Sequence, residues 1–176
     1  LNGNVWLPLA QLTRIQKALL NDVTGPPLSR LLPTRAFARG LARRTCTPPL
    51  DVEETAAIEG MLAHQDGMRV QHQLIQYLRE RRVHESSWLE SLASGPVPVA
   101  VVWGELDTIA PPRVADFVWE QHLRDRAAPS AYWRVPGANH YPQLDQPGVV
   151  AELLRAMPWT DPGRTVAGAR LVAAHG

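Results

Sequence analysis

Two side chains that could exchange protons, Asp107 and His140, each follow a predicted strand. Residues 97–103 form a valine-rich run bounded by Gly and Pro, which predicts a strand buried on both faces, and residues 130–135 predict a second strand. Catalytic groups in open parallel sheets lie beyond the carboxyl ends of the strands. A carboxylate there can hold an imidazole in one tautomer and stabilise its charged form. The spacing therefore indicates an Asp–His pair, whereas each residue alone is more often a turn or surface residue.

The loops that carry these two residues both match a known pattern. Residues 103–111, Trp-Gly-Glu-Leu-Asp-Thr-Ile-Ala-Pro, resemble the acid loop after the seventh strand of α/β-hydrolases, commonly WGxxDxxxP. Residues 137–147, Gly-Ala-Asn-His-Tyr-Pro-Gln-Leu-Asp-Gln-Pro, resemble the histidine loop of the same superfamily, commonly GxGHxPxxExP. The resemblance implies that Asp107 is the acid and His140 the base of a nucleophile–His–acid triad.

The histidine loop departs from the family pattern at two positions. Asn139 replaces the usual second glycine, and Asp145 replaces the usual glutamate. Neither change removes a catalytic group. Because asparagine tolerates a left-handed backbone, the first change is also mild for the loop conformation.

A second resemblance concerns the region before the strands. Residues 67–82, followed by Trp88, resemble the helical cap of haloalkane dehalogenases and epoxide hydrolases, and residues 2–4 and 7–9 resemble the exit from the sixth strand into that cap. Cap tyrosines of epoxide hydrolases donate to the epoxide oxygen. The resemblance therefore implies Tyr77 as a candidate substrate contact, with ordinary cap packing as the alternative.

The elements that must position these residues divide the chain into three parts. Residues 1–95 are predicted to be the sixth-strand exit and a helical cap, with helices over 8–20, 34–43, 51–64, 69–82 and 85–93. Residues 96–157 predict a β-α-β-α unit with parallel strands, and residues 158–176 a tail that is loose or marginally helical. The expected fold class is α/β, the C-terminal part of an α/β-hydrolase fold, mainly helical cap followed by this β-α-β-α unit.

Composition limits the classes of partner. The net charge is +1, and the 18 basic residues are nearly all arginine, so no basic field predicts nucleic-acid binding. No apolar run has the length of a membrane span. The single cysteine, Cys46, excludes a disulfide within the chain and a cysteine-based zinc site, and it fits a cytoplasmic protein. We expect a small-molecule substrate and neither a metal nor another cofactor.

A nucleophile is missing from the motifs of this sequence. No Gly-x-Ser-x-Gly elbow or Asp counterpart occurs, so we expect the nucleophile in an N-terminal half of the hydrolase fold upstream of residue 1. The resemblance then implies hydrolysis of a small, largely apolar ester, epoxide or haloalkane, with this chain inactive by itself. The alternative is a catalytically inactive truncated product, or a binding and interaction module. Either way, the isolated chain is expected to be marginally stable and prone to association.

Overall fold

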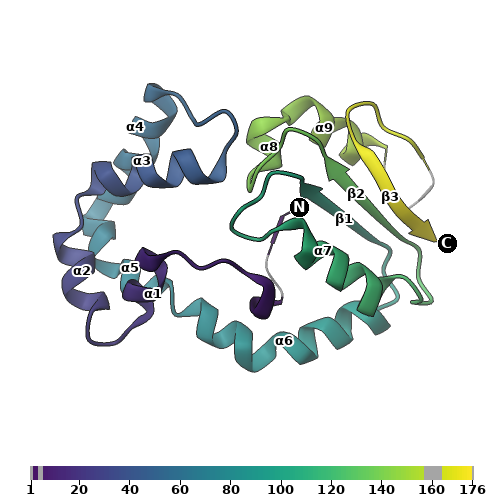
Figure 1. Ribbon diagram of the computed structural model, residues 1–176, viewed down its shortest axis with the longest axis horizontal. Helices are drawn as coiled ribbons and strands as arrows, with labels where there is room; N and C mark the ends of the chain where they lie inside the picture. The colour runs from purple at the N-terminus through teal and green to yellow at the C-terminus, as the bar shows by residue number, and fades with distance from the viewer. Residues whose placement is uncertain (1, 4–5, 157–163, 176) are drawn as a thin grey trace.

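The computed structural model describes residues 2–3, 6–156 and 164–175, and helices dominate its first half (Figure 1). These elements are η1 (Leu7–Leu9), α1 (Arg14–Leu20), α2 (Gly25–Leu31), α3 (Thr34–Thr45), α4 (Val52–Ala63), η2 (His64–Val70), α5 (Gln71–Leu74) and α6 (Tyr77–Ser94), where η1 and η2 are 3-10 helices. In the described part of the chain, no helix is both long enough and apolar enough to cross a membrane.

Two of these helices begin with a reciprocal capping box. The Asp51 side chain accepts from the backbone N–H of Glu54, whose carboxylate accepts in turn from the N–H of Asp51, as the sequence predicts. Thr13 and Gln16 make the same exchange at the start of α1. The helix expected from Pro8 therefore begins only at Arg14.

The helices expected over 69–82 and 85–93 are wrong in their boundaries. Gln65 and Asp66 adopt left-handed backbone angles, with φ of 48° and 58°. The chain then restarts in α5, where the backbone N–H of His72 donates to Ser29 Oγ (3.0 Å). From Tyr77 to Ser94 no Gly or Pro interrupts the sequence, so α6 joins the end of the first predicted segment to the whole of the second.

The second half of the chain builds a three-stranded sheet. Its elements are β1 (Val99–Gly104), α7 (Pro112–Val118), the π-helical η3 (Trp119–Leu123), β2 (Ser130–Val135), α8 (Pro142–Asp145), α9 (Pro147–Arg155) and β3 (Arg170–His175). Strands β1 and β2 pair in parallel from Val99↔Ser130 to Gly104↔Val135, which confirms the predicted parallel neighbours. The fold is mixed α/β.

The expectation for the tail is wrong. Residues 170–175 form β3, which pairs antiparallel with β2 and gives the strand order β1-β2-β3 (Figure 1). The pairing satisfies backbone groups that β2 would otherwise leave open on its outer edge. Residues 157–163 of the predicted tail, including Trp159, lie outside the described residues.

Strand β2 and the end of β1 are buried on both faces, as their apolar residues predict, whereas β3 has no buried residue. On one face, Trp103 and Tyr132 pack with side chains of α6, α7 and η3. On the other, Val102 and Trp133 pack against Leu153 of α9. Trp133 is 0% exposed and lies on the central strand. The two layers hold the sheet in place, and with it the loops that leave its carboxyl edge.

Candidate active site

The structure brings the predicted pair, Asp107 and His140, together at the carboxyl edge of β1 and β2. His140 Nδ1 lies 2.8 Å from Asp107 Oδ2. The Asp107 side chain is 0% exposed and that of His140 is 19% exposed. Among the described residues, His140 Nε2 has no hydrogen-bond partner. A buried acid thus holds one ring nitrogen while the other remains available to a reactant.

The surroundings of Asp107 keep it ionised. Burial alone would raise its pKa, but the hydrogen bond and charge of His140, with further donors from Ala110 and Asn2, lower the pKa below its ordinary value. Its Oδ1 accepts from the backbone N–H groups of Ile109 (2.8 Å) and Ala110 (2.9 Å). Because an ionised carboxylate only accepts hydrogen bonds, Nδ1 of neutral His140 carries the proton and Nε2 is the basic nitrogen.

The remaining motif residues of the acid loop have a packing role. The indole N–H of Trp103 donates to the carbonyl of Ala110 (2.8 Å), which closes the loop around Asp107. A Cβ placed on Gly104 would lie 2.1 Å from the carbonyl oxygen of Asn139 and 2.6 Å from that of Ala138. Only glycine therefore allows the acid loop and the histidine loop to approach this closely.

Asn2 joins the two loops and was not identified from the sequence. Its Oδ1 accepts from the backbone N–H of Gly104 (2.7 Å), and its Nδ2 donates to Asp107 Oδ2 (2.8 Å) and to the carbonyl of Asn139 (3.2 Å). The local signal was an Asn-Gly pair, which is typical of a turn. Nothing local connects it to residues more than 100 positions away.

Replacing Asn2 with Leu should therefore destabilise the site. The Gly104 N–H would lose its acceptor and Asp107 one donor, at a cost of about 1–3 kcal/mol in the free energy of unfolding. Urea unfolding measures this value. Gln143, an exposed residue of α8, provides the matched control, because Gln143→Leu removes a similar side chain that makes no described hydrogen bond. Equal losses for the two variants would contradict the bridging role of Asn2.

The histidine loop is also anchored to the helical segment. Asp145 accepts from the backbone N–H groups of Thr47 (2.9 Å) and Asn139 (2.6 Å), and Asn139 Nδ2 donates to Thr47 Oγ1 (3.1 Å). The N–H of Tyr141 donates to the carbonyl of Thr45 (3.1 Å). Asp145 thus ties the segment that follows α3 to the loop that carries the histidine.

Tyr77 begins α6 and is 46% exposed, with Arg81 over its ring at 5.0 Å. Burial raises the pKa of Tyr141. The ring of Tyr141 lies 5.2 Å from that of His140. A role of Tyr77 in substrate contact remains a prediction.

The Cys46 thiol is unsuited to be the nucleophile. It is 1% exposed, and burial raises its pKa. Its described hydrogen bond joins it to Thr45 Oγ1 (3.8 Å). Thiolates, which are the reactive form, are disfavoured in such surroundings. Across residues 2–3, 6–156 and 164–175, no three His, Cys, Asp or Glu side chains are grouped to hold a metal ion.

The lowered pKa of Asp107 predicts a pH dependence of stability. A carboxyl whose pKa is lowered by folding stabilises the fold above its ordinary pKa of 3.8, and this contribution is lost as the pH falls through the folded value. We expect the difference in unfolding free energy between the wild type and Asp107→Asn to be smaller below pH 4 than at pH 5. Urea unfolding at each pH tests this. A difference that does not change with pH would show that Asp107 is not ionised.

Comparisons with known proteins relate the chain to a named hydrolase. The chain is 36% identical over 152 residues to "Putative hydrolase LipZ" of Mycobacterium tuberculosis, a match that covers 86% of the chain and 51% of that protein. It is 27% identical over 161 residues to the mesoderm-specific transcript protein of Mus musculus, covering 83% of the chain and 43% of that protein. The Homo sapiens homolog matches to the same extent. No family model matches the chain.

The chain spans about half the length of the curated relatives it matches. The similarity to the mycobacterial protein supports a hydrolase at a general level. The mixed α/β architecture is compatible with part of an α/β-hydrolase.

Proposed function

We propose that this chain is the C-terminal part of an α/β-hydrolase and supplies the acid and the histidine of its triad. The observation that carries the proposal is the 2.8 Å contact between Asp107 and His140, each in a loop at the carboxyl edge of a parallel strand pair. The nucleophile, a Ser or an Asp, comes from an upstream half of the fold. The substrate is a small, largely apolar ester, epoxide or haloalkane.

In this proposal His140 transfers the proton, and Asp107 keeps His140 in the state that this transfer requires. His140 Nε2 takes the proton from a serine nucleophile, or from the water that hydrolyses an ester formed on an aspartate nucleophile. Asp107 keeps the ring in the required tautomer and stabilises the imidazolium that forms. The helices of residues 7–94 form a cap that excludes water from the site, with Tyr77 as a substrate contact.

The proposal of an upstream nucleophile requires a polypeptide longer than this chain. The curated relatives extend over roughly twice the length that the chain covers, so they have room for the strands and the nucleophile that the proposal requires. Strand β1 lies at one edge of the three-stranded sheet, and an upstream half would continue the sheet from that edge.

The identity of the nucleophile can be tested with His140→Gln in the polypeptide that includes the upstream sequence. If the nucleophile is Asp, it needs no base to attack, so the first step proceeds and a covalent ester accumulates. If it is Ser, attack itself needs the base and no adduct forms. Intact-mass spectrometry after incubation with an ester, an epoxide and a haloalkane distinguishes the two cases.

The wild-type polypeptide assayed on the same three substrates is the control. Failure to turn over any of them would count against the proposal. It would instead favour the alternative, a catalytically inactive protein that associates with a partner through its open sheet edge.

A further inference from the structure

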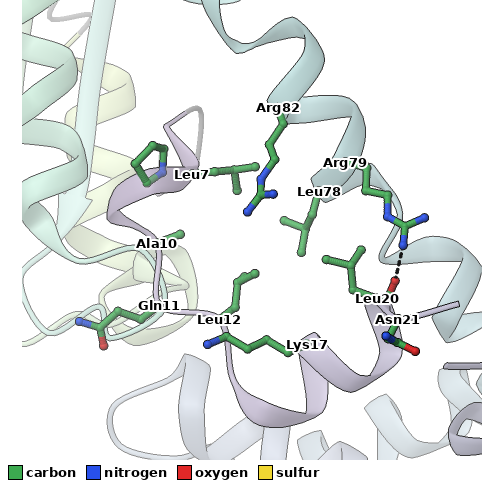
Figure 2. Close-up of a pocket in the computed structure, with 11 residues that line it drawn as sticks. Leu7, Ala10, Gln11, Leu12, Lys17, Leu20, Asn21, Leu78, Arg79 and Arg82 are labelled. Carbon is green, nitrogen blue, oxygen red and sulfur yellow. Dashed lines mark hydrogen bonds between the residues drawn. The ribbon is translucent and has the colours of Figure 1, made fainter. Parts of the chain in front are cut away.

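A cavity of about 760 Å³ lies between residues 7–21 and α6, away from the Asp107–His140 pair (Figure 2). Neither residue of the pair lines it. Its volume falls in the range of small-molecule sites, and its lining combines leucines with polar and basic side chains.

The apolar wall of this cavity comes from α1, the segment just before it, and α6. Leu12 precedes α1, Leu20 ends α1, and Leu78 lies in the first turn of α6. Leu78 is 4% exposed and packs in a cluster with Leu19 and Ile75, around which Leu12 and Leu20 also pack. The wall is therefore part of a packed core and not a loose surface.

The charged part of the cavity is basic and only partly neutralised. Arg79 is bound on one side, donating to Asp22 (3.0 Å) and to the carbonyl of Leu20 (2.8 Å). Arg82 follows Arg79 three positions further along α6. Its side chain points into the space between the leucines in Figure 2, and it has no partner among the described residues. Lys17 adds a second cation to the lining. None of the described lining residues is acidic.

We propose that this cavity binds a carboxylate that carries an alkyl chain. The planar guanidinium of Arg82 offers paired N–H donors that match the two oxygens of a carboxylate. The alkyl chain would cover the leucine wall and be removed from water. Binding needs both the carboxylate and the alkyl chain. An alcohol of the same length lacks the charge, and acetate lacks the chain.

The cavity is also connected to the acid loop. The backbone N–H of Gln11, a lining residue, donates to the carbonyl of Ile109 (3.0 Å), and the N–H of Ile109 donates to Asp107 Oδ1 (2.8 Å). Alkyl carboxylates are what hydrolysis of an apolar ester releases, so the cavity would take up a product of the proposed reaction. The binding itself does not rest on that reaction.

Isothermal titration of the chain with octanoate tests the proposal, with octan-1-ol and acetate as the two partial ligands. We expect saturable binding of octanoate at one site, and binding at least about tenfold weaker for Arg82→Gln, because a charged hydrogen-bonded contact is lost. Arg30→Gln removes an exposed charge from α2, outside the cavity, and should bind octanoate as the wild type does.

Three outcomes would overturn the proposal. The first is that octanoate does not bind. The second is that octan-1-ol binds as tightly as octanoate, which would show that the charge is not recognised. The third is that Arg82→Gln and Arg30→Gln bind octanoate equally well, which would place the ligand elsewhere. A circular dichroism spectrum of each variant confirms that it is folded before titration.

Discussion

Asp107→Asn should reduce the turnover number of the polypeptide that contains the upstream half by about 10⁴-fold, with a smaller change in KM. The amide oxygen can still accept from Ile109 and Ala110, so these two backbone contacts are kept. The amide NH₂ then replaces the oxygen that accepts from His140 Nδ1. A donor at that place favours the tautomer with the proton on Nε2, which cannot act as a base.

Steady-state kinetics on whichever ester, epoxide or haloalkane the wild type hydrolyses gives this value. Asp125→Asn is the matched control, because Asp125 is an exposed aspartate whose described ion pair joins it only to its neighbour Arg124 (3.4 Å). The control should keep wild-type turnover. A loss of less than about tenfold for Asp107→Asn would mean that the acid does not set the state of His140.

Trp133→Ala should lower the free energy of unfolding by about 3–5 kcal/mol, the usual range when a large aromatic side chain is removed from a core. Trp133 lies on the central strand and is 0% exposed, packed with Val102 and Leu153. The cavity left behind would separate the sheet from α9. Since β1 and β2 carry the two loops of the site, the sheet edge should loosen with it.

Trp133→Phe is the companion variant for this prediction. The indole N–H of Trp133 has no hydrogen-bond partner among the described residues, so phenylalanine removes an unsatisfied polar group while keeping most of the ring. Its loss in urea unfolding should be clearly smaller than that of alanine. Equal losses for the two variants would indicate that volume at this position does not hold the sheet to α9.

The central part of the fold was predictable because its signals are local. The run at 97–103 and the segment 130–135 combine β-branched or aromatic residues with Gly and Pro at their ends, and both form strands. The third strand has no such signal. Residues 170–175 contain two alanines and owe their conformation to pairing with β2, which is information that the segment itself does not hold.

In the candidate site, too, some roles follow from local sequence signals and others only from the complete fold. Asp107 and His140 could be paired from the sequence because parallel strands end at the same edge of a sheet. The role of Asn2 could not, because its three partners lie in loops brought to it only by the complete fold. The capping box of Thr13 and Gln16 was not predicted, although Thr-x-x-Gln is a known helix start, because the apolar spacing from residue 8 onward indicated an earlier beginning. The role of Asp145 follows from its contacts with Thr47 and Asn139.

The proposal that His140 is the base of a hydrolase is tested most directly by its removal. Turnover should be compared between His140→Ala and His64→Ala in the polypeptide that includes the upstream half, where His64 is an exposed residue at the end of α4. We predict that His140→Ala loses at least about 10³-fold in turnover, whereas His64→Ala keeps wild-type turnover. Unchanged turnover of His140→Ala would contradict the assignment of His140, and with it the hydrolase triad proposed for this chain.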